Sequence, residues 1–229
     1  MKNNQLLCAG ILALGLTLAG WFVYAGIRKV ADNNRAVTVK GLSTRDVHAD
    51  HVVWPLRFTV HGNNLPAAYA ELSRVQKTVT QFFVEKGFAE SDLSTGDISV
   101  NDQWAHYYGH KPEYHYALTT SLVLSTDQVE RVVQNRGCQG ELLSKGIILS
   151  SDEWNVDYQY NSLNELKPEM IEEATKNARA VAQKFADDSN SRLGGIRCAN
   201  QGQFSVDGDR YQPWIKHVRV VTTVDFYLN

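Results

Sequence analysis

PEMIEEATKNARAVAQKF, residues 168–185, is the stretch that decides how the C-terminal part of this chain folds. Its apolar residues recur at steps of three and four positions: Ile171, Ala174, Ala178, Val181 and Phe185. This spacing predicts one apolar stripe along an α-helix. Pro168 suits the first turn of a helix, and Glu172 and Lys176 lie four residues apart on the outer face. We therefore predict that a helix begins at Pro168 and buries this stripe.

Stretches with a period of two lie on both sides of this helix, and such alternation is typical of β-strands. We predict strands over residues 37–39, 52–60, 98–104, 114–124, 147–149, 154–160, 196–206 and 218–228. Pro55 cannot donate a backbone hydrogen bond, so its strand is expected at a sheet edge or bulged there. Asp207-Gly208-Asp209 predicts a hairpin turn ahead of the last strand.

Two further helices are expected earlier in the chain. The first is predicted over residues 66–86 from the apolar positions Leu72, Val75, Val79 and Phe82. Ser125 and Gln128 resemble a capping box that opens the second helix. The order is then strand-strand-helix three times, followed by two strands. Strand pairs with short connections predict an α+β fold, in which about three helices cover one face of antiparallel sheet.

Residues 6–27, LLCAGILALGLTLAGWFVYAGI, carry no charged side chain. A helix over this stretch would be about 33 Å long, which matches a bilayer core of about 30 Å. We expect a single transmembrane signal anchor from Leu6 to Ile27, and a signal peptide cleaved near Ala25 is the alternative. The chain then divides into a cytoplasmic N-terminus (1–5), the anchor (6–27), a linker (28–34) and one α+β domain (35–229).

The composition excludes two classes of protein. The net charge is −2 at pH 7, so the chain lacks the basic face that binding to nucleic-acid phosphates requires. A content of 43% hydrophobic and 10% aromatic residues is too high for a disordered chain. No G-x-S-x-G or other nucleophile motif is present, so we expect neither an enzyme nor a cofactor.

Five short motifs occur in a recognisable order along the chain. They are Val37-Thr38-Val39-Lys40-Gly41, Gly87-Phe88, Asp92-Leu93-Ser94-Thr95, Gly146-Ile147-Ile148-Leu149, and the alanines Ala174, Ala178 and Ala182 followed by Leu193-Gly194. In this order, over about residues 35–228, they resemble the SIMPL domain family of bacterial envelope proteins. The chain departs from the family at residues 50–55, DHVVWP, where many members carry a Pro-Asp pair.

The resemblance implies an extracytoplasmic location, usually periplasmic. It also implies self-assembly, because members are similar to a periplasmic immunogenic protein that forms large rings with a channel-like centre. Other members are linked to protection from oxidative stress, and the family has no established catalytic residues. The resemblance therefore places the domain in the periplasm, anchored to the inner membrane and partnered by copies of itself. Arg28 and Lys29 favour the opposite orientation by the positive-inside rule.

Residues 104–116, WAHYYGHKPEYHY, are the richest in groups that could carry chemistry. Imidazole and carboxylate groups suit zinc or copper, and the candidate ligands are His106, His110, Glu113 and His115. The other interpretation is a contact between subunits, because Trp and Tyr are enriched at interface cores. Its candidate residues are Trp104, Tyr107, Tyr108 and Tyr114. We favour the contact over the metal site.

Cys138 and Cys198 are the only cysteines outside the expected membrane segment. In an oxidising periplasm two such cysteines can form a disulfide. The alternative is that both are small, unpaired residues.

Overall fold

The computed structural model describes residues 14–26, 35–105, 107, 109–150 and 156–229. The chain forms two compact units. The terminal unit contains the chain up to Arg45 together with Glu165–Ser205 and Val218–Asn229, and the middle unit contains Asp46–Asn164 and Val206–His217. The single α+β domain expected over residues 35–229 is thus divided between two units. Each is considered by itself below.

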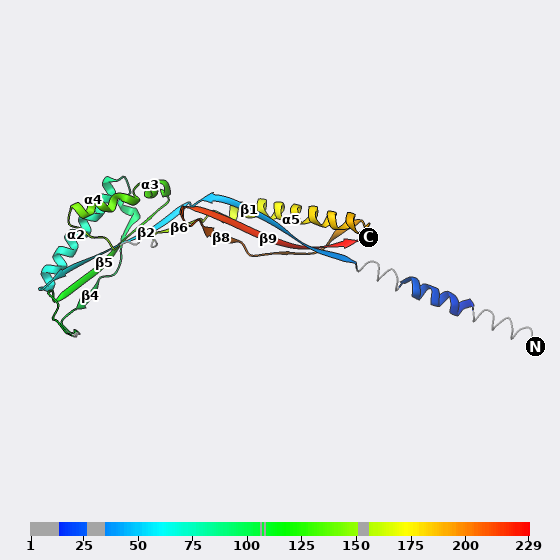
Figure 1. The fold of residues 1–229 in the computed structure, drawn as a ribbon, viewed down its shortest axis with the longest axis horizontal. Coiled ribbons are helices and arrows are strands. Elements are labelled where there is room, and N and C mark those ends of the chain that lie inside the picture. The colour runs from blue at the N-terminus through cyan, green and yellow to red at the C-terminus, as the bar shows by residue number, and fades with distance from the viewer. Residues whose placement is uncertain (1–13, 27–34, 106, 108, 151–155) are drawn as a thin grey trace, which may run out of the picture. The chain divides into compact units, whose positions relative to one another are not determined.

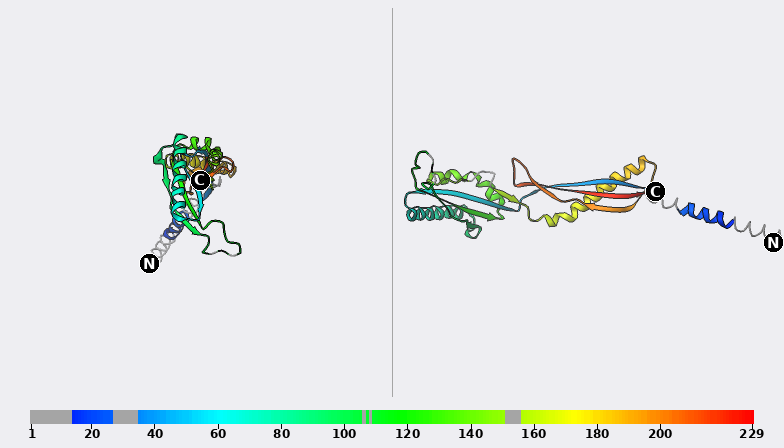
Figure 2. Two further views of the ribbon diagram at one scale, coloured as in Figure 1. Left: turned by 90° about the vertical axis from the view of Figure 1, so that its left-hand side faces the viewer. Right: turned by 90° about the horizontal axis from the view of Figure 1, so that it is seen from below.

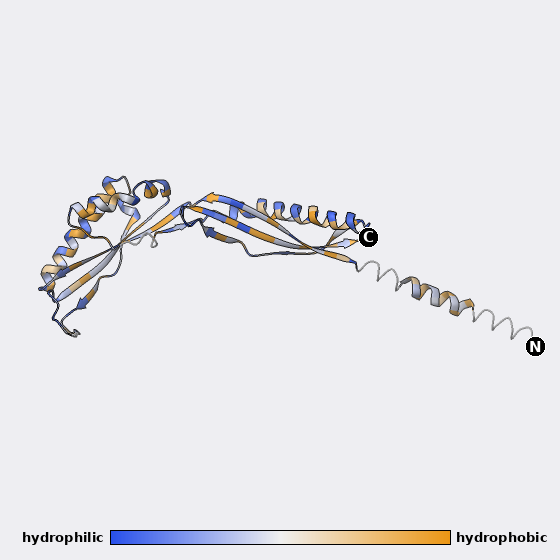
Figure 3. Ribbon diagram, in the orientation of Figure 1, coloured by the Kyte–Doolittle hydropathy of each residue, from blue (hydrophilic) through white to orange (hydrophobic). Residues whose placement is uncertain are grey.

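The terminal unit is a sheet covered on one face by a long helix (Figures 1 and 2). The sheet has the order β1 (Ala36–His48), β9 (Ile215–Leu228), β7 (Leu193–Gln201), and β8 (Ser205–Gly208) also pairs with β9. Hydrophobic and hydrophilic residues alternate along β9 (Figure 3). The inward-facing side chains meet the helix α5 (Leu163–Asp188) in a small core of Val39, Ala178, Ala182, Val224 and Phe226.

The prediction of a helix at the position of α5 is correct, but its predicted first residue is wrong. The helix begins at Leu163, so Pro168 lies inside it and not in its first turn. The carboxylate of Asp50 accepts hydrogen bonds from the backbone nitrogens of Asn161 (2.7 Å) and Ser162 (2.8 Å). Burial alone would raise the pKa of Asp50, but these hydrogen bonds outweigh it, and the pKa lies below its ordinary value. A tertiary contact thus fixes the chain just ahead of α5.

The buried face of α5 also differs from the predicted stripe. Val181 and Phe185 are exposed, and the fully buried positions repeat every four residues: Met170, Ala174, Ala178, Ala182 and Ala186. The reason is the short distance between the backbones of α5 and β1. A Cβ atom added at Gly41 on β1 would overlap the carbonyl oxygen of Ala174 and come within 2.6 Å of the backbone nitrogen of Ala178. Only small side chains fit between elements this close.

The middle unit is a five-stranded antiparallel sheet with helices on one face. The strand order is β3 (Leu93–Thr95), β5 (Tyr116–Thr126), β2 (His51–Gly62), β6 (Asp157–Gln159), and β4 (Ser99–Asp102) also pairs with β5. The central β2 and β5 pair over residues 52–62 and 116–126. The helices α2 (Leu65–Glu85), α3 (Val129–Gln134) and α4 (Gln139–Ser144) contribute to one hydrophobic core with Trp54, Leu56 and Phe58 of β2.

Helix α2 confirms its prediction to within one residue at each end. The side chain of Asn64 accepts a hydrogen bond from the backbone nitrogen of Ala67 (3.0 Å), and Gly87 follows the helix with a φ of 91°, which favours glycine. The predicted stripe is buried, and Phe83 joins it in an edge-to-face contact with Trp54 at 5.6 Å.

Several short predictions are wrong, and one is correct in part. Strand β2 lies between β5 and β6, but β6 pairs only with residues 51–53, so Pro55 is paired on the β5 side alone among the described strands, as its missing N–H predicts. Residues 147–149 form no strand, since only Leu149 bridges to Phe58. The predicted strand 196–206 is two strands, β7 and β8, and β3 was not predicted. Ser125 belongs to β5, and Gln128 makes no side-chain cap, so the capping box does not form. These segments are held by neighbouring strands, which local sequence patterns do not reveal.

Part of the expected membrane segment falls within the described residues, where residues 14–26 are helical. None of the helices in the described parts of the chain is both long and apolar enough to span a membrane. Residues 6–13 and Ile27 of the expected segment lie outside the described residues.

The close approach at Gly41 makes a testable prediction for stability. Gly41→Ala should lower the free energy of unfolding by roughly 1–3 kcal/mol, because the added methyl group must push α5 away from β1. Gly195→Ala in β7 is the control, since a Cβ atom there meets nothing within 4 Å. Urea unfolding of the full-length protein measures both. Equal stability of the two variants would show that the helix does not approach β1 this closely.

Candidate functional site

The connection between β4 and β5 contains a stack of aromatic rings. The indole of Trp104 lies 4.1 Å from the imidazole of His115, with 11° between the planes, and His115 lies 3.9 Å from the ring of Tyr116. The indole N–H donates a hydrogen bond to the carbonyl of Pro112 (3.0 Å), and the ammonium of Lys111 lies 3.3 Å from the indole centroid. The loop is therefore shaped by contacts among its own residues.

These contacts determine where the predicted metal ligands lie and which of them are already engaged. His115 lies within the stack, and its Nε2 atom faces the carboxylate of Asp102 at 3.1 Å. His110 and Glu113 are exposed, and His106 lies outside the described residues. Among the residues that the structure describes, no group of three His, Cys, Asp or Glu side chains could hold a metal ion.

The predicted contact residues are divided between the stack and the surface. Trp104 is half-buried in the stack, whereas Tyr107 and Tyr114 are exposed. The ring of Tyr114 lies 5.7 Å from that of His61 on β2. Tyr108 lies outside the described residues. Two tyrosine rings of this loop are therefore available to a partner.

The two cysteines of the predicted disulfide are both free in this structure. Cys138 is buried in the middle unit and Cys198 is exposed on β7 in the terminal unit. Burial raises the pKa of the Cys138 thiol, so this group is poorly reactive.

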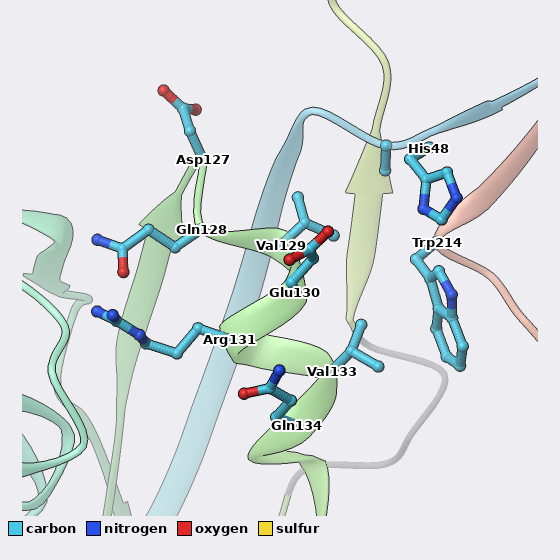
Figure 4. Close-up of a pocket in the computed structure, with 10 residues that line it drawn as sticks. His48, Asp127, Gln128, Val129, Glu130, Arg131, Val133, Gln134 and Trp214 are labelled. Atoms are coloured by element: carbon cyan, nitrogen blue, oxygen red, sulfur yellow. The ribbon is translucent and has the colours of Figure 1, made fainter.

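A cavity of about 660 Å³ opens at the start of α3, and the residues that line it come from segments distant in the sequence (Figure 4). Val129, Glu130 and Val133 of α3 form one side, and His48 and Trp214 form the other. Trp214 is held in place because its carbonyl accepts a hydrogen bond from the backbone nitrogen of Ala49 (2.7 Å).

Two charged residues at the cavity are engaged elsewhere. The carboxylate of Asp127 lies 2.7 Å from Nδ1 of His51, and the guanidinium of Arg131 donates to the carbonyl of Gly87. Glu130, by contrast, is exposed and makes no hydrogen bond or ion pair with any described residue. The carboxylate of Glu130 is thus not held by a hydrogen bond or ion pair, whereas the guanidinium of Arg131 keeps its positive charge.

His51 also links Asp127 to Ser125, whose Oγ atom lies 3.0 Å from Nε2 of His51. This order of groups resembles a base-activated serine. The side chain of Asp127 is 86% exposed, however, whereas the acid of such a relay works in a site shielded from water. Ser125 is also not among the residues that line the cavity, so the three groups do not lie in it together. It serves as a link between β2 and β5.

A second histidine joins three segments of the middle unit. Nδ1 of His217 lies 2.5 Å from the carboxylate of Asp46, and Nε2 lies 3.8 Å from that of Asp209. The hydrogen bond to Asp46 is the main cause of a raised pKa of His217. Asp209 accepts hydrogen bonds from the backbone nitrogens of Tyr211 (2.8 Å) and Gln212 (2.7 Å). The hairpin predicted at residues 207–209 therefore turns later, over residues 209–214, since Asp207 and Gly208 belong to β8. This His217 clasp fixes the loop that carries Trp214.

Sequence reasoning identified the aromatic loop but missed the cavity. His48, Glu130 and Trp214 lie in three separate segments, and no motif or periodicity connects them. Only the tertiary fold of the middle unit brings them together.

Comparison with known protein families identifies a match over most of the chain. The model of a family described as SIMPL, protein of unknown function (DUF541), matches residues 37–217. No curated protein matches the chain.

The His217 clasp predicts a dependence of stability on pH. A raised pKa means that the folded state binds the proton more tightly, so the stabilisation is complete below about pH 6.5, the ordinary value for His. It is lost as the pH rises through the raised pKa. The melting temperature of the wild type should therefore fall further between pH 6 and pH 9 than that of His217→Gln. His110→Gln is the control, and identical pH profiles of all three proteins would contradict the clasp.

Proposed function

The chain belongs to the SIMPL family, described as proteins of unknown function, and on this basis we propose that it is a membrane-anchored periplasmic protein that assembles with copies of itself. The assembly is a ring, cage or channel-like oligomer. Residues 6–27 are the anchor in the inner membrane. The resemblance to ring-forming and stress-related members supports both the location and a role in the cell envelope. The proposal includes no catalytic activity.

The open edge of β1 is the observation that carries the proposal. Among the described strands, β1 pairs only with β9, so no strand pairs with the other edge of this 13-residue strand, although the carbonyl of Leu42 accepts a side-chain hydrogen bond from Asn177. Such an edge is a template for a strand of another chain. Soluble proteins usually cover or interrupt an edge of this length.

The flank of α5 beside this edge is apolar in the C-terminal part of the helix, whereas Glu169 and Glu173 of its first half bind Arg45 of β1. Asn177 donates a hydrogen bond to the carbonyl of Leu42 on β1 (2.8 Å). Val181 and Phe185 follow Asn177 by four and eight residues, so they lie on the same side of the helix. They are 40% and 54% exposed. A strand added to β1 would bring apolar surface against these two side chains, which adds hydrophobic stabilisation to the backbone hydrogen bonds.

The direction of the strands favours a ring. Figure 1 shows β1 and β9 running in opposite directions, and β7 pairs antiparallel with β9. Strands β1 and β7 therefore point the same way. Placing β1 of one copy beside β7 of the next gives parallel pairing, with all copies in one orientation. This is a head-to-tail contact, which closes into a ring when the rotation between copies permits. All N-terminal segments would then reach the same membrane.

The alternative is a periplasmic module that binds a ligand or metal through residues 104–116. The aromatic stack engages His115, and this favours the use of the loop as a contact surface. Tyr107 and Tyr114 are then a second point of contact between copies.

The apolar flank can be tested with one substitution. Phe185→Lys should lower the mass of the assembly formed by the detergent-solubilised full-length protein, because the substitution places a charge against the proposed neighbouring copy. The side chain is exposed, so the fold should be unaffected. Tyr69→Lys is the matched control, since Tyr69 is equally exposed, at 54%, on α2. Light scattering measures the mass. A monomeric wild type, or a Phe185→Lys variant with wild-type mass, would refute the contact.

The tyrosines provide a separate test. Replacing both Tyr107 and Tyr114 with Ser should reduce the assembly to smaller species, since interface tyrosines contribute large contact areas. Sedimentation velocity distinguishes the species. Tyr211→Ser, at an exposed tyrosine outside the loop, should leave the distribution unchanged. A distribution that stays unchanged when both loop tyrosines are replaced would assign the loop no part in assembly.

A further inference from the structure

The cavity at the start of α3 has the size and walls of a site for a small molecule. Its volume of about 660 Å³ lies within the range of ligand sites, roughly 300–1,000 Å³. Val129 and Val133 supply apolar surface, and the indole of Trp214 faces them across the opening (Figure 4). The wall is thus apolar and aromatic, with polar groups at a few positions.

The charges at the cavity favour a cation. Arg131 extends from α3 away from Trp214 in Figure 4 and is bound to the carbonyl of Gly87. Asp127 is bound to His51. Arg136 lies over the indole of Trp214 at 5.5 Å but is not among the residues that line this cavity. Arg131 keeps its positive charge, since a backbone carbonyl does not neutralise it, but this charge is directed away from Trp214. The carboxylate of Glu130 is the acidic group of the wall that no hydrogen bond or ion pair to a described residue engages.

We propose that this cavity binds a small organic cation, namely a protonated amine that carries an apolar or aromatic group. The ammonium group donates a charge-assisted hydrogen bond to the carboxylate of Glu130. The face of Trp214 attracts the same positive charge. The apolar part of the ligand packs against Val129 and Val133, which removes its surface from water. An anion of the same shape would be repelled by the carboxylate of Glu130.

This binding site is independent of self-assembly. Its residues all belong to the middle unit, whereas the open edge of β1 and its apolar flank belong mainly to the terminal unit. Loss of assembly would leave the cavity proposal standing, and loss of ligand binding would leave the assembly proposal standing.

Three probes of matched shape test the proposal on the full-length protein at pH 7: 2-phenylethylamine, 2-phenylethanol and phenylacetate. Calorimetric titration should give the amine an affinity at least about tenfold above that of the alcohol, the effect of one charge-assisted hydrogen bond. Phenylacetate should bind most weakly. Equal affinity of the amine and the alcohol, or no binding of the amine, would overturn the proposal.

Variants assign the selectivity to its residues. Glu130→Gln should reduce the affinity for the amine to that for the alcohol, while Glu113→Gln, at an exposed loop carboxylate, should change neither. Trp214→Leu should weaken both ligands. Glu130 also lies in the first turn of α3, where a carboxylate favours the helix, so thermal unfolding is measured alongside. A folded Glu130→Gln variant that still prefers the amine would contradict the proposal.

Discussion

The contact between the backbones of α5 and β1 at Gly41 is the constraint on which the terminal unit depends. A glycine on the strand and an alanine at every fourth position on the helix allow the two elements to touch without intervening side chains. Because the helix and the strand lie so close, the side chains between them are small: the five buried positions of α5 are occupied by four alanines and one methionine. This closeness also displaces Val181 and Phe185 to the flank of the helix, beside an edge of the sheet that is open.

The middle unit uses the opposite solution. Its core is built from large side chains, among them Trp54, Phe58 and Phe83, between a sheet and three helices on one face. Connections between its strands carry two further features, since the aromatic stack of Trp104 lies between β4 and β5, and Trp214, which lines the cavity, lies between β8 and β9. One unit thus offers an edge for pairing, and the other offers shaped surface for contacts and ligands.

The sequence predicts those parts of the fold that local patterns specify. The position of α2 follows from its apolar stripe, and the family follows from the order of short motifs. The buried face of α5 could not be read in this way. Hydrophobicity ranks Val181 and Phe185 above Ala182 and Ala186, whereas the distance to Gly41 selects for small size. The cavity was unpredictable for a different reason, since His48, Glu130 and Trp214 come from three separate segments that only the tertiary fold brings together.

The central claim is that packing α5 over one face of the sheet leaves the edge of β1 to be completed by another copy of the chain. Amide hydrogen exchange of the full-length protein in detergent tests this most directly, when it is measured at concentrations above and below dissociation of the assembly. The account predicts that backbone amides of β1 exchange more slowly in the assembly, because they gain hydrogen bonds from the neighbouring strand. Exchange rates in β1 that stay the same while the mass of the particle changes would contradict it.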